Sequence, residues 1–235
     1  MSLRVKIDAS LIVYRVDQDQ CSTEITTTQK RSFDRMVNFT DAVVAIAITL
    51  QLLPLMDIKG PGSGSSMLDV LLENSSQLFA FLISFLIIAY LWIKHNQVFN
   101  ILRTYDVFIS WLNTFWMLGI VFFPWPAAMY GSLTSEEFAE SHGVGLLYWW
   151  TLAAISGLGC LIARHAWHNP HLLESCVRDI HDKQNGYGAQ RGVGFFIYFL
   201  VIGVVSEFAP QFAPYLMFGI IPINLLLKGQ KRIAI

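Results

Sequence analysis

Charged residues are scarce in this 235-residue chain, in which Asp, Glu, Lys and Arg together make up 14%. A soluble domain carries about 25% charge, so the composition argues against a globular enzyme with a large core. Hydrophobic residues account for 54%, and the mean hydropathy is +0.48. The formal net charge of −1 gives no reason to expect a nucleic-acid partner. The sequence therefore predicts a multi-pass protein of the lipid bilayer.

Cysteines and catalytic motifs are also scarce. The three cysteines form no close pair and no CxxC motif, so a disulfide framework is not expected. The chain has no Ser-His-Asp spacing and no glycine-rich phosphate loop. With no motif for catalysis, we expect no enzyme activity and no bound cofactor.

Three histidines, His165, His168 and His171, occur in the stretch HAWHNPH. This spacing can place metal ligands on one side of a helix. However, Pro170 interrupts the stretch and no acidic residue lies within it. Because a metal site needs a complete ligand set, we expect none here. A membrane-embedded metalloenzyme that uses the three histidines is an alternative, which bound metal would reveal.

Six apolar stretches are long enough, or nearly so, for a bilayer core that takes about 20 helical residues. We predict spans at residues 36–55, 77–98, 107–130, 144–163, 192–209 and 212–227. Residues 1–30 lack the apolar region of a signal peptide and are predicted to form an N-terminal cytoplasmic extension. Residues 31–235 would then form an all-α domain of six transmembrane helices.

Basic residues fall almost entirely on one side of these predicted spans. If the N-terminus is cytoplasmic, every Lys and Arg except Lys59 lies on the cytoplasmic side. Cytoplasmic loops of membrane proteins are rich in Lys and Arg. The distribution therefore predicts that both termini are cytoplasmic.

Tryptophan residues lie mostly toward the ends of the predicted spans. Trp116 and Trp149 are two examples. The amphipathic ring of tryptophan favours the interface between bilayer and water, so we expect these side chains there.

The first predicted span begins with polar residues. Residues 35–54 read RMVNFTDAVVAIAITLQLLP, in which arginine, asparagine, threonine and aspartate lead directly into an apolar run. A charged residue near the bilayer centre costs about 2.5 to 3.5 kcal/mol on insertion scales. These polar groups are therefore expected to have protein or water partners.

Four residues further along this span share one side of a helix. At about 100° per residue, Leu50 lies about 40° from Ile46, Leu53 about 20° to the other side, and Thr49 about 60° away. Ordinary helix packing explains such a stripe, and a conducting pore is the alternative.

The polar start of this span resembles a known signature. Arg35-x-x-x-Phe39-Thr40-Asp41, followed by AVVAIAITLQLLP, is similar to the R-x-x-x-F-S-D signature and first helix of the lysosomal potassium channel family. This is the transmembrane protein 175 family with its prokaryotic relatives. Thr40 stands where the family usually has serine, so the hydroxyl is kept and a methyl group is added.

The resemblance extends to the next two spans. YLWIKHNQVFNIL, residues 90–102, resembles the second helix of the family, with Trp92 and His95. WLNTFWMLGIVFFPWP, residues 111–126, resembles the third helix, with Asn113. The similarity therefore covers about residues 35 to 130.

The resemblance implies a potassium channel, present as a homotetramer in the plasma membrane of a prokaryote, in which four copies of the first helix surround the pore. Potassium would be the permeant ion. Ile46 would form the narrowest ring, and Leu50 and Leu53 further apolar rings, which together act as a hydrophobic gate that closes by dewetting. The Thr49 hydroxyl would supply modest selectivity over sodium. TVGYG, the carbonyl filter of other potassium channels, is absent.

The polar residues have a structural role in this scheme. The resemblance implies a hydrogen-bonded network that fixes the first helix against its neighbours. Its members would be Arg35, Phe39, Thr40, Asp41, Trp92, His95 and Asn113. An aspartate that only caps the start of the helix is the alternative for Asp41.

A proton-coupled or secondary transporter is the competing class of protein. Asp41, Glu207 and His95 would then be substrate or proton sites. Inverted internal repeats would favour a transporter, and none is visible in the sequence.

Overall fold

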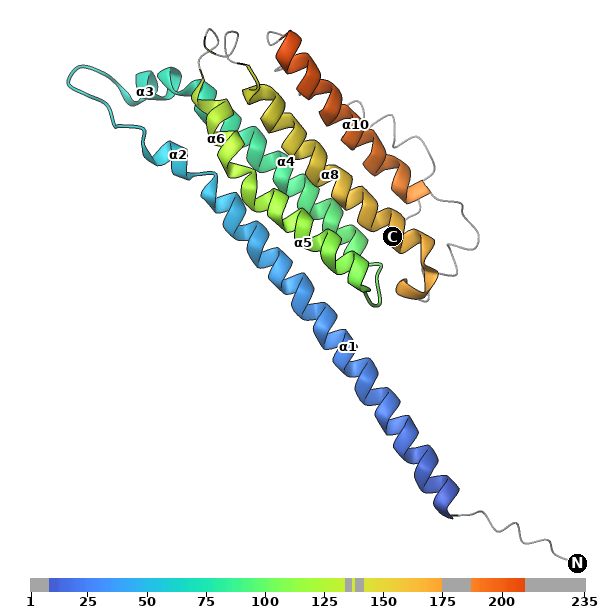
Figure 1. Ribbon diagram of the computed structural model, residues 1–235. Coiled ribbons are helices and arrows are strands. Elements are labelled where there is room, and N and C mark those ends of the chain that lie inside the picture. Colours follow the sequence, from blue (N-terminus) through green and yellow to red (C-terminus); the bar gives the residue numbers. More distant parts are fainter. Residues whose placement is uncertain (1–8, 134–136, 138–141, 175–186, 210–235) are drawn as a thin grey trace, which may run out of the picture.

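The computed structural model describes residues 9–133, 137, 142–174 and 187–209. The described residues form helices in the order α1 (Ala9–Leu50), α2 (Leu53–Met56), α3 (Met67–Glu73), α4 (Ser75–Phe99), α5 (Val107–Phe122), α6 (Pro124–Ser132), α8 (Val144–His168), the 3₁₀ helix η1 (Pro170–Leu172) and α10 (Tyr187–Phe208). Apart from these helices, the described part contains one isolated β-bridge, between Leu102 and Leu173. Figure 1 shows α4, α5, α8 and α10 running lengthwise in one bundle, with α1 along its side.

Four helical segments are long and apolar enough to cross a membrane. They are Lys30–Met56, Ser75–Phe99, Val107–Ser132 and Val144–His168, and Val193–Phe208 is a shorter apolar helix. These segments confirm an all-helical membrane protein in the described residues and coincide with the first five predicted spans. The predicted sixth span, at 212–227, lies outside the described residues.

Helix α1 is much longer than a membrane span. Its 42 residues reach about 63 Å at 1.5 Å per residue, about twice the thickness of a hydrocarbon core. Figure 1 shows its N-terminal half projecting beyond the bundle. From Ala9 onward, the predicted N-terminal extension is therefore the first part of the same continuous helix that enters the bundle.

The third predicted span is divided into two helices by proline. Helix α5 ends at Phe122, and α6 begins at Pro124. Proline has no backbone N–H and its ring collides with the preceding turn, so it interrupts a helix. The two helices together still form one membrane-length segment, Val107–Ser132.

The core contains two clusters of buried apolar side chains. The larger cluster joins α4, α5, α6, α8 and α10, and α1 contributes Val44 and Ala47. The smaller cluster includes Phe33 of α1 and lies where α4, α5 and α8 approach the η1 segment. Trp116 and Trp149 are fully buried in the larger cluster, so their predicted interface position is wrong. Their rings fill space between helices instead.

Candidate functional site

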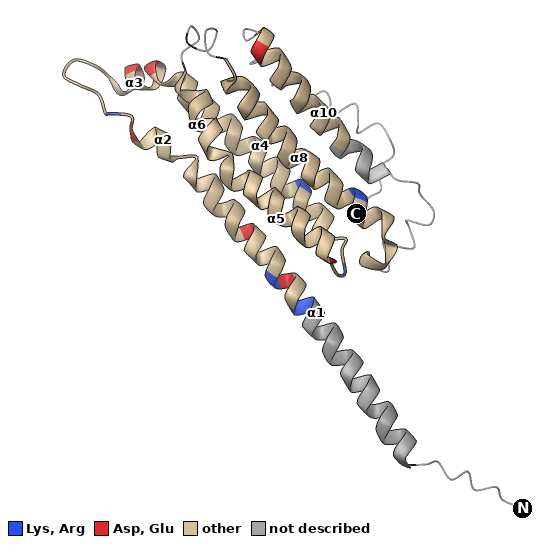
Figure 2. Cartoon of the chain, viewed as in Figure 1, with Lys and Arg blue, Asp and Glu red and all other residues tan. Residues whose placement is uncertain are grey.

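Helix α1 presents two faces of opposite character to its surroundings. Thr40, Val44, Ala47 and Gln51 are all buried against the bundle. Their spacing of four, three and four residues places them on one side of an α-helix. Figure 2 shows few charged residues along the bundle, and those of α1 lie mainly toward the region where the helix leaves it.

The stripe predicted from the sequence, Ile46, Thr49, Leu50 and Leu53, lies on the opposite, exposed side of α1 and its continuation. Ile46 is 59% exposed, Leu53 54% and Leu50 37%. Thr49 is also exposed, and its hydroxyl donates to the Ile46 carbonyl at 2.8 Å. The stripe therefore contacts little of the described part of its own chain and faces lipid or another copy.

Thr40, Asn113 and His95 form a continuous chain of hydrogen bonds between α1, α5 and α4. Asn113 Nδ2 donates to Thr40 Oγ1 at 2.8 Å, and Thr40 Oγ1 donates to the Met36 carbonyl at 2.9 Å. Asn113 Oδ1 lies 2.9 Å from His95 Nε2. A carbonyl oxygen only accepts, so His95 carries its proton on Nε2 in this arrangement. All three side chains are buried, and each has its partner.

Aromatic rings hold His95 from both faces. The centroid of its ring lies 4.3 Å from that of Phe99 and 3.9 Å from that of Trp116, and both pairs are stacked. The stacking fixes the direction in which Nε2 points and therefore the bond to Asn113.

Asp41 provides a second connection between α1 and α4. Trp92 Nε1 donates to its carboxylate oxygen Oδ1 at 2.8 Å. Asp41 lies one residue beyond Thr40, so α1 is tied to α5 and to α4 by adjacent residues. This bond is more than a cap, because it reaches another helix.

Arg35 and Phe39 are not part of this network. Both are exposed, and both lie within about 20° of Ile46 around the helix axis. Neither ion pair in the described residues involves Arg35 or Asp41. The residues thus continue the exposed side of α1, and Asp41 uses Trp92 instead.

Glu207, a proton site in the transporter alternative, is hydrogen-bonded at the N-terminal end of α8. Its Oε2 accepts from the Gly143 N–H at 2.8 Å, and its Oε1 lies 3.2 Å from His142 Nδ1. Gly143 has a φ of 85° and precedes α8, so the carboxylate of α10 caps the N-terminus of α8. A negative charge is stabilising at that position.

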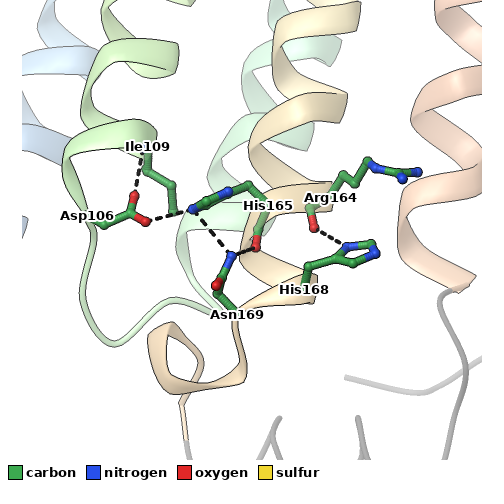
Figure 3. Close-up of polar contacts among 6 residues, drawn as sticks. All are labelled: Asp106, Ile109, Arg164, His165, His168 and Asn169. Atoms are coloured by element: carbon green, nitrogen blue, oxygen red, sulfur yellow. Dashed lines mark hydrogen bonds and ion pairs between the residues drawn. The ribbon is translucent and has the colours of Figure 1, made fainter.

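Of the three histidines of HAWHNPH only His165 connects two helices, His171 is exposed, and the three do not converge. Figure 3 shows His165 Nε2 at 2.7 Å from Asp106 Oδ2, while Asp106 Oδ1 accepts from the Ile109 N–H at 2.8 Å and caps α5. His168 Nδ1 bonds to the Arg164 carbonyl at 2.8 Å, in another direction. The described residues contain no group of three or more His, Cys, Asp or Glu side chains that could hold a metal ion.

Asp106 carries a shifted pKa at this connection. Burial raises the pKa of its carboxyl, but the Ile109 N–H and His165 lower it by more, so that the pKa lies below its ordinary value. The aspartate is thus held in its charged form, which suits a helix cap.

An open cavity of about 870 Å³ adjoins the end of the stripe. Leu53 and Pro54 form one wall, and α3, α4 and α6 form the others. Three acidic residues, Asp57, Asp69 and Glu73, and one basic residue, Lys59, also line it, so the lining is acidic on balance. The last apolar residue of the stripe therefore borders an acidic space.

The sequence analysis did not predict the positions of two residues near the site. Trp116 was expected at the interface, although it stacks on His95. Gln51 had no expected role, although it is buried on the side of α1 that carries Thr40. The spacing of Gln51 from Thr40, which is eleven residues and close to three helical turns, was a signal for the second residue.

Comparison with known proteins identifies relatives. Residues 35–124 match the family described as endosomal/lysosomal potassium channel TMEM175. A potassium channel of Streptomyces collinus is 30% identical over 143 residues, which cover 61% of this chain and 68% of that protein. A potassium channel of a Chryseobacterium species is 27% identical over 187 residues, or 79% of this chain and 86% of the other.

The vertebrate relatives are longer. The Homo sapiens protein named endosomal/lysosomal proton channel TMEM175 is 26% identical over 144 residues, which cover 61% of this chain and 28% of that protein. The match thus spans less than a third of its length.

A solved structure shares the fold. The crystal structure of a lysosomal potassium-selective channel TMEM175 homolog from Chamaesiphon minutus matches with a TM-score of 0.66 and 21% identity, over 85% of this chain and 100% of that one. Membrane-length helices and this fold define an all-helical protein of the bilayer. The chain belongs to the TMEM175 family, as its R-x-x-x-F-T-D signature predicts. The family is one of channels and not of enzymes.

Proposed function

We propose that the protein is a potassium-permeable channel, modestly selective over sodium, with a pore lined by α1 in a homotetramer. One observation carries the proposal. From Ile46 to Leu53 the exposed side of this segment is apolar apart from Thr49, while Thr40 and Asp41 of the same helix are bonded to α5 and α4. A helix fixed in this way presents its stripe outward in every copy, so four copies can enclose a pore.

The stripe supports a gate that works without a filter of carbonyl groups. Ile46 forms the narrowest ring, and Leu50 and Leu53 form rings toward the acidic cavity. A narrow apolar ring excludes water, and ions do not pass where no ligand replaces their hydration shell. Widening of the ring admits water and ions together. The acidic residues near Leu53 favour cations over anions at this entrance.

Thr49 supplies the oxygen for selectivity. Its hydroxyl donates to the Ile46 carbonyl, so the hydroxyl oxygen keeps its lone pairs for a passing cation. One hydroxyl per copy replaces only part of a hydration shell, and the expected selectivity is modest for that reason. Potassium is the permeant ion in this proposal, and no cofactor takes part.

Six transmembrane helices with both termini in the cytoplasm suit the distribution of basic residues. Lys59 follows α2 and is alone on the outer side in this orientation. The cavity beside Leu53 then opens to the outside of the cell membrane.

The carrier alternative has less support. Asp41 is bonded to Trp92, and Glu207 caps α8, so both carboxylates have structural partners. Proton conduction has one observation in its favour, which is that vertebrate relatives are named proton channels.

Reconstitution of the purified protein into planar bilayers tests the proposal. With potassium on one side and sodium on the other, we expect discrete current steps and a reversal potential that leans toward potassium. Protein-free bilayers are the control. Slow saturable flux without steps would support a carrier, and a reversal potential that follows a pH gradient would support a proton channel.

A further inference from the structure

Gln51 is buried at the end of α1 without a hydrogen-bond partner. Its side chain is 4% exposed, and neither Oε1 nor Nε2 has a partner. The neighbours Leu50 and Leu52 are both exposed, so the amide alone points inward from this turn. Burial of an unpaired amide is unfavourable, because the group loses its bonds to water and gains none.

The missing partner cannot come from a second copy of the chain. Both polar atoms of Gln51 are already covered by its own chain. A neighbour could reach them only after the end of α1 had moved. The Gln51 amide can therefore gain a hydrogen-bond partner only if this segment moves or if a water is buried beside it. Such a water itself needs two to four polar partners.

The backbone is able to move at this point because its helix is interrupted. Helix α1 ends at Leu50 and α2 begins at Leu53, with Leu52 N–H bonded to the Thr49 carbonyl at 3.1 Å. Pro54 has no N–H to offer the Leu50 carbonyl. No backbone N–H of the described residues donates to the carbonyl of Leu50 or Gln51. The turn that carries the unpaired Gln51 amide thus also has two carbonyls without a backbone partner.

Gln77 holds the same junction from α4. Its Nε2 donates to the Pro54 carbonyl at 2.8 Å. Helix α4 is a firm support here, because a Cβ on Gly131 of α6 would lie 2.9 Å from the Cβ of Ala80. The two helices are therefore closely packed, and the bond of Gln77 connects a rigid pair of helices to a weakly bonded segment.

We propose that the junction between α1 and α2 is a two-position hinge that sets the gate, and that Gln51 and Gln77 favour opposite positions. The proposal rests on the proposed channel function. In the described position, Gln77 binds the Pro54 carbonyl and Gln51 is unpaired. In the second position, the Gln77 bond is broken and the Gln51 amide is hydrogen-bonded. Leu50 and Leu53 flank Gln51, so the movement displaces two apolar rings. Both glutamines are positioning residues and contact no ion.

Two substitutions test the hinge in the full-length channel. Gln51→Met keeps the length of the side chain and removes the unpaired amide, so it favours the described position. Gln77→Met removes the bond to Pro54 and favours the second position. In single-channel recordings we expect open probability to change about three- to tenfold in each variant and in opposite directions. The reversal potential should be unchanged in both. Gln97→Met is the matched control, because Gln97 is an exposed glutamine at the far end of α4.

The melting temperature of the purified variants gives a second, independent measurement. We expect it to rise in Gln51→Met and to fall in Gln77→Met. A fall in Gln51→Met would show that the amide already has a partner, such as a buried water, and would overturn the hinge. Open probabilities that shift in the same direction, or not at all, would overturn it too. A wild-type protein that conducts no ions would instead overturn the proposed function, and the melting temperatures would still decide the hinge.

Discussion

The two faces of α1 differ in what surrounds them. The inner face carries Thr40 and Asp41, whose polar atoms are bonded to Asn113 and Trp92. The outer face carries Ile46 and its apolar neighbours, which contact little of their own chain. In a soluble protein the apolar face would be the buried one.

The two faces therefore have different roles. The inner face fixes α1 against its neighbours, and the outer face is presented to lipid or to other copies of the chain. Polar groups have no water partners in a bilayer, so each hydrogen bond to a neighbouring helix specifies rotation and depth. Apolar contacts are less directional and allow movement. The inner face therefore holds α1 in place, while the outer face is free to line a pore that widens and narrows.

The largest expected effect comes from removal of the central residue of the inner face. Asn113→Leu leaves the His95 side chain unpaired in a buried site, at a cost of about 1 to 3 kcal/mol, and removes the bond that links Thr40 to α5. We expect a large loss of folded protein and a lower melting temperature in detergent. Asn100→Leu is the control, because Asn100 is exposed at the end of α4. Equal stability of the two variants would show that the inner face does not fix α1.

A change on the outer face should alter conduction and leave stability intact. Ile46→Asn makes the narrowest ring polar, so water fills it more readily and we expect current to rise several-fold. Ile197→Asn is the control, since Ile197 is an isoleucine of α10 with similar exposure. An unchanged current in Ile46→Asn would place the gate elsewhere.

A smaller effect is expected from the hydroxyl of the outer face. Thr49→Val removes an oxygen at nearly constant volume, so we expect the reversal potential under opposed potassium and sodium gradients to shift toward zero. Thr114→Val is matched to it, because the Thr114 hydroxyl is also exposed and bonded to a carbonyl of its own helix, at 2.9 Å. A shift in neither variant would remove Thr49 from the account of selectivity.

The smallest expected effect is on stability and concerns Asp106, which lies on neither face of α1. The pKa of Asp106 is lowered on folding, so this group contributes stability above its unfolded pKa of about 3.9 and loses it as pH falls through the folded value. Asp106→Asn should therefore be slightly less stable than wild type at pH 7. The difference in melting temperature should shrink below about pH 4. A difference that stays constant with pH would contradict this.

The sequence predicted the first five spans and the shared helix side of the stripe because both follow from simple rules, whereas the outward role of the stripe was implied by the family resemblance. An apolar run of about 20 residues is long enough for a bilayer, and the spacing of Ile46, Leu50 and Leu53 defines one side of a helix. The network of Thr40, His95 and Asn113 was predicted from the family resemblance and the need of buried polar groups for partners.

Other features required the packing itself. A membrane helix is apolar on all sides, so periodicity does not show which face is buried, and Trp116 was therefore misplaced. The resemblance placed Arg35 in the same network as Asp41, but the two lie on different sides of α1. The unpaired state of Gln51 depends on neighbours from other helices, which spacing along one helix does not reveal.

Accessibility of Ile46 from water tests the central claim most directly. In a channel whose native cysteines have been replaced by serine, Ile46→Cys and Ile197→Cys are exposed to a small, charged, thiol-reactive reagent during single-channel recording. We predict that the reagent blocks the current of Ile46→Cys and leaves that of Ile197→Cys unchanged. A current that persists in Ile46→Cys, with the modification verified by mass, would contradict the claim that α1 lines the pore.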